Sequence, residues 1–356
     1  SDVCSSDLLH LQITMFGTPL RRFASTVNSA VFQKYGNPLS VLKMQATQLK
    51  ALCSKDVQIK MVASAMSAAD LCAVSGRNPA GFAFPAVAGS EGVGIVEKVG
   101  SGVSSLKENQ MVMLIKPFQG TWTERAVVSE DALLAVPNGL APEIACHLLG
   151  DAGAAYKMLT SFADLKAGDV VLQNDACSPI GRCVVQLCKA RGIKTVNIVK
   201  DCPKCDACGK KMLEEMGGDI VVSESQLDGT DLKKSLSALP PVKLVLNGRG
   251  GCVMSEVLKM VRGVDVVTYC ESSCQSFRAS AAELMTQSLS LRGFSMNCWL
   301  KSAKKEEVAA LVGELAGAVA KGELKFNTKE VKFEEVMSCV EKAANSTCGG
   351  TRVIKL

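Results

Sequence analysis

Apolar and polar residues follow a pattern between residues 170 and 200 that predicts a strand, a turn, a helix and a second strand. The apolar run 170–173 predicts a buried strand, and residues 195–199 predict another. Between these strands, apolar residues recur at helical spacing after a turn that contains Ser178 and Gly181. This order is typical of the first β-α-β unit of a dinucleotide-binding sheet, in which the amino end of the helix offers free amides to a pyrophosphate.

The turn of this unit lacks the usual G-x-G-x-x-G pattern, because only Gly181 stands where its last glycine is expected. Ser178 is predicted to cap the helix, and Pro179 suits the first helical position, where a missing N–H costs the helix nothing. Pro179 nevertheless removes one amide from the phosphate site. We expect Ser178 and Gly181 to contact the pyrophosphate.

The remaining pattern divides into a strand-rich first part and an alternating second part. Short β-branched segments separated by turn residues predict a small, partly open β-barrel, with strands near 57–62, 92–99, 111–115 and 123–128. Further apolar strands alternate with amphipathic helices, with strands predicted at 220–222, 242–247 and 264–269 and helices at 253–261, 304–321 and 334–344. A last strand is predicted at 351–356.

Composition adds limits to this picture. A chain of 356 residues, 47% hydrophobic and 21% charged, is long enough for two domains with ample core. Its apolar runs stay below the roughly 18 residues that span a bilayer, so no transmembrane segment is expected. The net charge of +5 is mild. The Lys and Arg residues form no stripe with interleaved aromatics, so no nucleic-acid partner is expected.

The composition of the amino-terminal segment indicates where in the cell the protein is targeted. Residues 15–50 contain no Asp or Glu, and Arg21 and Arg22 lie among Ser, Thr and Ala residues. This composition predicts a mitochondrial transit peptide, with a disordered tail as the alternative.

Sixteen cysteines are expected to be mainly free thiols, since no secretory signal precedes them. Cys202, Cys205 and Cys208 are spaced like metal ligands. A fourth ligand is not evident nearby, and the chain has only two histidines. We therefore expect no bound metal, and solvent-facing thiols at the start of a helix instead.

One motif in the strand-rich part leads to a family. Gly89 and Glu91 are followed by Gly94, Gly100 and Val103, and this spacing resembles the signature of the medium-chain dehydrogenase/reductase superfamily. The blocks FPAVAGSEGVGIVEKVGSGVSSLK, GTWTERAVVSEDALLAVP, AAYKML, LKAGDVVLQN, TVNIVKDCP, VTY and LRGF together resemble mitochondrial 2-enoyl thioester reductase. They occur in the order of that family from about residue 30 to 356. A quinone reductase of the same superfamily fits these blocks less well.

The resemblance implies an α/β fold in which a GroES-like, partly open β-barrel is joined to a doubly wound parallel Rossmann sheet. The implied domain order is a transit peptide or disordered segment at 1–29 and a GroES-like catalytic domain at 30–150. A Rossmann nucleotide-binding domain follows at 151–298, and residues 299–356 return to the catalytic domain.

The activity implied by the resemblance is NADPH-dependent reduction of trans-2-enoyl thioesters, carried on acyl carrier protein or CoA, to saturated acyl thioesters in mitochondrial fatty-acid synthesis. The protein would act in the mitochondrial matrix, without a metal, as a homodimer formed by edge pairing of its Rossmann sheets. Its cofactor would be NADPH.

The site residues implied by the resemblance are of two kinds. At the substrate, Asn78 stands where the family has a tyrosine that hydrogen-bonds substrate and assists protonation. Around the cofactor, the matching positions are Asp151, Tyr156, Ser178, Gly181, Lys200, Asn247, Gly250 and Tyr269. Lys200 is the one cation kept for the 2′-phosphate of NADPH, since Cys202 replaces the second.

Several further positions depart from the family pattern. Cys270 and Glu271 replace a glycine pair near the expected nicotinamide site. At the substrate, the amide of Asn78 can donate a hydrogen bond but cannot serve as an acid that gives up a proton, as the tyrosine of the family does. An alternative function therefore stays open, in which the chain is a catalytically inactive relative that acts as a mitochondrial binding or assembly subunit.

Overall fold

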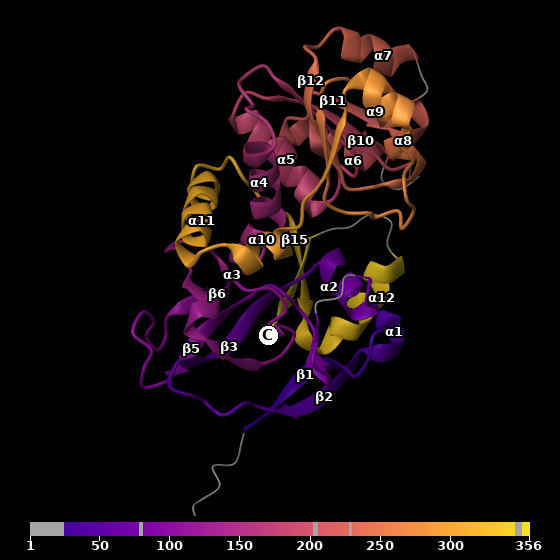
Figure 1. The fold of residues 1–356 in the computed structure, drawn as a ribbon. Helices are drawn as coiled ribbons and strands as arrows, with labels where there is room; N and C mark the ends of the chain where they lie inside the picture. The colour runs from indigo at the N-terminus through magenta and orange to yellow at the C-terminus, as the bar shows by residue number, and fades with distance from the viewer. Residues whose placement is uncertain (1–24, 78–80, 202–205, 228–229, 346–350) are drawn as a thin grey trace, which may run out of the picture.

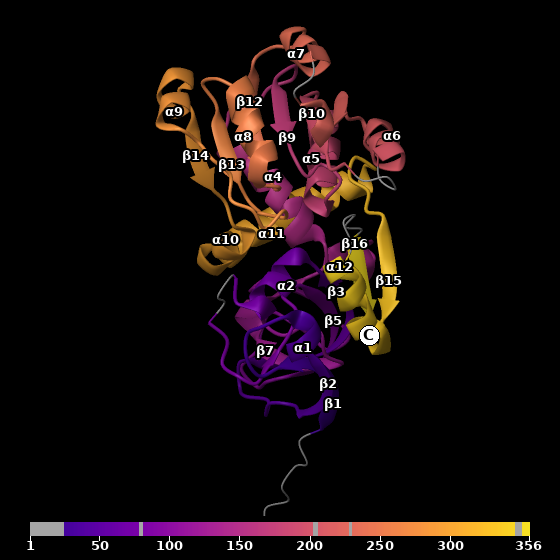
Figure 2. The ribbon, with the colours of Figure 1, turned by 90° about the vertical axis from the view of Figure 1, so that its right-hand side faces the viewer.

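The protein has two packed parts, a Rossmann-type domain and a β-barrel domain (Figures 1 and 2). The computed structural model describes residues 25–77, 81–201, 206–227, 230–345 and 351–356. Figure 1 places the barrel, with the start of the described chain, below the Rossmann domain, and the carboxyl-terminal strand lies back on the barrel.

The Rossmann domain contains a six-stranded, entirely parallel sheet. Its strand order is β11-β10-β9-β12-β13-β14, so the order reverses between β9 and β12. The strands are β9 (Val170–Gln173), β10 (Lys194–Val199), β11 (Ile220–Ser223), β12 (Val242–Asn247), β13 (Asp265–Thr268) and β14 (Ser290–Gly293). The central strands are buried on both faces, which explains why they read as continuous apolar runs in the sequence.

Helices cover both faces of this sheet (Figure 2). They are α4 (Ala154–Ser161), α5 (Pro179–Ala190), α6 (Asp206–Met216), α7 (Thr230–Ser237), α8 (Gly251–Met260) and α9 (Ala281–Gln287). Alternate strand residues point to opposite sides: Val171 and Leu246 pack in the core that α4 and α5 share, whereas Leu172 and Val245 pack against α8. The expected doubly wound sheet is thus confirmed.

The barrel is built from two sheets. The larger has the order β15-β16-β3-β5-β6-β8, with β7 also paired to β3, and the smaller has the order β2-β1-β4. The strands are β1 (Thr26–Phe32), β2 (Lys43–Gln48), β3 (Asp56–Met66), β4 (Ala86–Val87), β5 (Gly92–Val99), β6 (Met111–Leu114), β7 (Arg125–Ser129), β8 (Leu133–Ala135), β15 (Thr328–Lys332) and β16 (Thr351–Lys355). The helices that accompany this part are α1 (Pro38–Val41), α2 (Ala68–Ser75), α3 (Pro142–Ala145) and α12 (Val336–Asn345).

The carboxyl-terminal segment ties the two domains together. After β14 the chain forms α10 (Met296–Ser302) and α11 (Lys305–Ala320), and it then returns to the barrel, where β16 pairs antiparallel with β3. A single hydrophobic core crosses the junction, because Val93 of the barrel and Leu311 of α11 belong to the same buried cluster as the Rossmann residue Val171.

The first strand corrects the predicted start of the barrel. A boundary at residue 30 is too late, because Thr26 already pairs with Gln48 in the β1–β2 ladder. The residues 26–29 of the predicted leader range are therefore strand residues with a defined register. Residues 1–24, which carry the rest of the predicted transit peptide, lie outside the described part of the chain, as do Cys202 and Cys205.

Within the described residues, none of the helices combines the length and the apolar character that crossing a membrane requires.

Candidate dinucleotide site

The carboxyl edge of the parallel sheet is held in shape by a buried amide network. Asn247, at the end of β12, is fully buried. Its Oδ1 accepts hydrogen bonds from Asn174 Nδ2 at 2.8 Å and from the Gly250 amide at 2.9 Å. Its Nδ2 donates a hydrogen bond to Thr268 Oγ1 at 3.1 Å. Asn174 Oδ1 in turn accepts from the amide of Gly248 at 2.7 Å. The side chain of Asn247 therefore organises the loop after β12.

The turn after β9 forms the cap that the sequence predicts. Ser178 is the N-cap of α5, and its hydroxyl accepts from the Gly181 amide at 3.1 Å. A Cβ at Gly181 would lie 2.6 Å from the carbonyl oxygen of Ala176, so only glycine lets the helix approach the turn this closely. Asp175 has a left-handed backbone, with φ of 58°. The tight turn that a pyrophosphate requires is thus present without its first glycines.

A buried hydroxyl group lies beside this turn. Tyr269 follows β13, and its Oη is buried without a hydrogen-bond partner among the described residues. Ser178 faces this hydroxyl, and a Cβ at Gly248 would collide with it. Burial raises the pKa of Tyr269 well above its usual value, so the hydroxyl stays protonated. The edge therefore holds a buried hydroxyl that has no well-formed hydrogen bond and that faces the N-cap residue Ser178.

The end of β10 carries the charged positions expected for the adenosine ribose. Lys200 and Asp201 directly follow this strand. Both carboxylate oxygens of Asp201 accept hydrogen bonds from Ser225, one from its amide at 2.8 Å and one from its hydroxyl at 3.0 Å. Asp201 is thus bound to the loop after β11, and Lys200 lies beside it at the end of the same strand.

An ion pair crosses the same edge. Arg249 Nε lies 2.8 Å from Glu224 Oε1, and the two side chains are only 16% and 17% exposed. Burial raises the pKa of the nearby Asp175 carboxyl. A hydrogen bond with Ser272 and the positive charges of Arg249 and Lys200 lower this pKa and so oppose the effect of burial. The sequence patterns did not single out Glu224, Arg249 or Asp175, since each lies in a turn whose partners come from other strands.

The junction between the domains presents a second group of predicted residues. Asp151 lies in a π-helical turn, Leu148–Gly153, and its Oδ2 is 2.9 Å from His147 Nδ1. Such π-turns occur frequently at functional sites. Tyr156 follows on α4 and is half-buried against the shared core, and the neighbouring Lys157 ammonium lies 4.8 Å from the ring centre of Trp299.

Glu91 links the barrel signature to this junction. Its Oε2 accepts from the Gly150 amide at 2.8 Å. Burial, with a smaller contribution from the charge of Asp151, raises the pKa of Glu91 to about 8, so this carboxyl is protonated at neutral pH. The motif Gly89-x-Glu91 was a family signal in the sequence, but its role as an interdomain contact requires the tertiary structure.

The predicted site residues thus fall in two places. Six of them meet at or beside the carboxyl edge of the sheet: Ser178, Gly181, Lys200, Asn247, Gly250 and Tyr269. Asp151 and Tyr156 lie at the domain junction. Asn78 lies outside the described residues. Its neighbour Arg77, at the end of α2, donates from Nη1 to Cys274 Sγ at 2.8 Å and so connects the barrel to the loop after β13.

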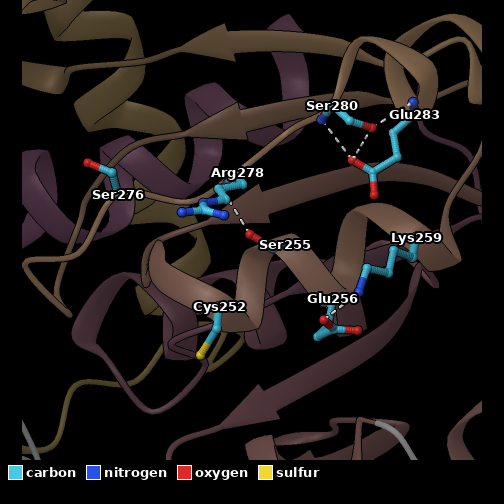
Figure 3. Close-up of a pocket in the computed structure, with 8 residues that line it drawn as sticks. All are labelled: Cys252, Ser255, Glu256, Lys259, Ser276, Arg278, Ser280 and Glu283. Atoms are coloured by element: carbon cyan, nitrogen blue, oxygen red, sulfur yellow. Dashed lines mark hydrogen bonds and ion pairs between the residues drawn. The ribbon is translucent and has the colours of Figure 1, made fainter.

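A separate hollow of about 460 Å³ opens along α8 (Figure 3). Its polar groups bind one another: Lys259 pairs with Glu256 at 2.6 Å, Ser280 with Glu283 at 2.9 Å, and the Arg278 amide donates to Ser255 Oγ at 2.8 Å. The hollow includes none of the residues predicted to bind cofactor or substrate, so the carboxyl edge of the sheet remains the candidate site.

The strand order, the glycine turn and the attached barrel define a two-domain protein of the medium-chain dehydrogenase/reductase superfamily. Residues 54–138 match the family model "Alcohol dehydrogenase GroES-like domain". The chain is 33% identical over 340 residues to the mitochondrial enoyl-[acyl-carrier-protein] reductase of Dictyostelium discoideum, which covers 95% of this chain and 97% of that protein. It is 30% identical to the human protein of that name, over 93% of this chain and 89% of the relative. The chain therefore belongs to the mitochondrial enoyl-[acyl-carrier-protein] reductase family.

Solved structures agree with this fold. The complex of Etr1p with NADP and crotonyl-CoA superposes with a TM-score of 0.85 at 23% identity, covering 93% of this chain and all of the other. A heterodimer of the mitochondrial 2-enoyl thioester reductases Etr1p and Etr2p from Candida tropicalis gives 0.84 at 23% identity, with the same coverage. At this identity the likeness establishes the shared two-domain fold.

Proposed function

We propose that this protein reduces trans-2-enoyl thioesters, carried on acyl carrier protein or CoA, with NADPH as the reductant. The observation that carries the proposal is the meeting of six predicted cofactor residues at the edge of a parallel sheet whose strand order reverses there. Doubly wound sheets bind their ligands at this switch point. Membership of a family of enoyl reductases supports the reaction type.

The residues at this edge fit a dinucleotide. The buried Oη of Tyr269 has no partner among the described residues, and the contact of Gly181 with Ala176 keeps the turn tight. Ser178 and Gly181 would hold the pyrophosphate, Lys200 the 2′-phosphate, and Asn247 keeps the adjacent loop in place. Once bound, NADPH supplies a hydride to the β-carbon of the enoyl thioester.

At the substrate, Asn78 is proposed to orient the thioester. Its amide N–H donates a hydrogen bond to the carbonyl oxygen, where negative charge develops during reduction. An amide does not release a proton, so the proton that reaches the α-carbon comes from another group or from water. In this proposal Asn78 orients the thioester and does not act as the catalytic acid.

Titration with NADPH and then NADH tests the proposal directly. Binding is followed by calorimetry and by tryptophan fluorescence. Trp122 is fully buried in the barrel, whereas Trp299 lies beside Lys157 at the junction, so a Trp299→Phe variant separates the two signals. Micromolar NADPH binding, followed by NADPH consumption with crotonyl-CoA and longer enoyl thioesters, supports the proposal. Binding without turnover of any enoyl thioester contradicts it.

One observation favours the alternative of an inactive binding or assembly subunit. The guanidinium of Arg249 is already paired with the Glu224 carboxylate, and the Asp175 carboxyl lies in the turn where a pyrophosphate would bind. Absence of binding of either nucleotide up to millimolar concentration would support this alternative and direct attention to mitochondrial protein partners.

The mitochondrial names of the relatives, together with the acid-free segment 15–50, support action in the mitochondrial matrix. A homodimer is proposed through β14. This strand is the edge of the Rossmann sheet, all four of its residues are exposed, and Leu291 is 42% exposed. An exposed edge strand of this kind is a template for pairing with a second copy.

A further inference from the structure

The ion pair between Glu224 and Arg249 joins two loops that are distant along the sheet. Glu224 follows β11, and Arg249 follows β12, with β10 and β9 between them in the strand order. Three inter-strand spacings separate the parent strands, about 14 Å in total. A 2.8 Å contact between the two side chains therefore passes over the carboxyl ends of β10 and β9.

Both loops that carry this bridge are held in place by hydrogen bonds at or beside the paired residues. On one side, the Arg249 amide donates to Asn174 Oδ1 at 3.0 Å, within the buried amide network. On the other side, the Ser225 amide and hydroxyl bind the two oxygens of Asp201. Opening of the ion pair thus requires rotation of two side chains and leaves the loops in place.

The charges around the bridge match those that recognise a phosphate. The charges of Arg249 and Lys200 both lower the pKa of the Asp175 carboxyl, whereas the charge of Glu224 raises it, so both cations lie within electrostatic range of this carboxyl. The Arg guanidinium binds carboxylate and phosphate through the same fork of N–H groups. In dinucleotide-binding sheets the adenosine lies across the second strand, and a nearby Arg accommodates the 2′-phosphate of NADP.

We propose that Arg249 is a specificity-determining residue for NADPH, and that Glu224 is its internal competitor. In the free protein the Glu224 carboxylate occupies the guanidinium. An adenosine 2′-phosphate takes the place of this carboxylate on Arg249, with Lys200 as the second cation, and Glu224 turns to solvent. NADH lacks the 2′-phosphate and cannot make the exchange. This inference rests on the proposed function, because it assigns the residues that select its cofactor.

The test uses the full chain and two adenosine fragments, so it does not depend on activity. Adenosine 2′,5′-bisphosphate and adenosine 5′-monophosphate are titrated by calorimetry into the wild type, Arg249→Met, Glu224→Gln and the double variant. Arg249→Met is expected to weaken bisphosphate binding about tenfold or more and to change monophosphate binding less than about twofold. Glu224→Gln is expected to strengthen bisphosphate binding about tenfold, and the double variant to lose that gain.

Two further variants keep the outcome interpretable. Arg249→Lys retains the charge without the fork and is expected to fall between the wild type and Arg249→Met. Arg125→Met breaks a comparable pair, Arg125 Nε to Glu97 Oε2 at 3.0 Å, on the barrel, and is expected to leave both affinities unchanged. Thermal unfolding verifies that each variant is folded.

The results separate the two proposals. An equal loss of affinity for the two fragments in Arg249→Met would overturn the role of this pair, as would weaker bisphosphate binding in Glu224→Gln. Neither result would contradict the proposed binding of NADPH. If both the wild type and Glu224→Gln fail to bind the two fragments and NADPH, both proposals are overturned. Binding that appears only in Glu224→Gln supports the competition between Glu224 and the phosphate.

Discussion

The amide of Gly150, in the π-helical turn, donates a 2.8 Å hydrogen bond to the Glu91 carboxyl of the barrel. This contact joins two segments that are 59 residues apart in the sequence. It places an acid whose pKa is raised to about 8 at the junction of the two domains, with Asp151, Asp70 and His147 around it.

This raised pKa predicts how stability depends on pH. Unfolded Glu91 releases its proton near its ordinary pKa of 4.5, whereas the folded protein retains the proton until about pH 8. The contribution of Glu91 is therefore complete below pH 4.5 and is lost as the pH rises to 8, with a slope of up to about 1.4 kcal/mol per pH unit. Urea unfolding of the wild type and of Glu91→Gln between pH 5 and 9 measures it. A slope that Glu91→Gln leaves unchanged would contradict the assignment.

Replacement of Asn247 tests the amide network. Asn247→Ala leaves the Gly250 amide and the Asn174 side chain without their acceptor, and we expect a loss of about 2–4 kcal/mol in the free energy of unfolding. Asn297→Ala, at a half-buried position on α10, is the matched control and should cost well under 1 kcal/mol. Comparable losses in the two variants would show that the network does not stabilise the loop.

Replacement of Gly181 tests the tight turn. A Cβ there lies 2.6 Å from a backbone oxygen, so Gly181→Ala must displace α5 or the turn and is expected to cost about 1–3 kcal/mol and to weaken dinucleotide binding. Gly313→Ala, in the interior of α11, meets nothing within 4 Å and is expected to stabilise the protein by about 0.5–1 kcal/mol. Thermal unfolding and NADPH titration distinguish the Gly181→Ala and Gly313→Ala variants. Unchanged NADPH binding in Gly181→Ala would show that this turn is not part of the dinucleotide site.

Lys200 is expected to act on NADPH selectively. Lys200→Ala should weaken NADPH binding about tenfold, with little effect on NADH, because only NADPH carries the 2′-phosphate. Lys194→Ala, at the opposite end of the same strand, provides a control of equal charge. Calorimetric titration gives both affinities, and equal losses for NADPH and NADH would exclude Lys200 from phosphate recognition.

The edge strand β14 allows a test of the proposed dimer. Leu291→Lys places a charge on this exposed edge and is expected to convert the dimer to a monomer in analytical ultracentrifugation. Met285→Lys, on α9 at 75% exposure, adds the same charge to a neighbouring surface and should leave the dimer intact. A dimer that persists in Leu291→Lys would place the interface elsewhere.

Much of the fold could be predicted from local pattern. The strands at 170–173 and 242–247 were predicted with the bounds that the structure has, because strands buried on both faces consist of continuous apolar residues between clear turns. Ser178 was recognised as a helix cap for a similar reason, since the capping hydrogen bond is formed within three residues. The start of β1 at Thr26 cannot be predicted from local pattern, because the ladder that defines this strand forms with a strand that begins at Lys43.

The sequence by itself determined the alternation of strands and helices, the glycine turn and the family, since these depend on hydrophobic period and short motifs. Only the tertiary structure decided which side chains meet. Glu224 and Arg249 are 25 residues apart, and their contact depends on the order of four strands in the sheet. Glu91 acquires its raised pKa from burial at a junction formed by distant segments. Charge and hydrogen bonding act over a few ångströms in space, and chain folding sets those distances.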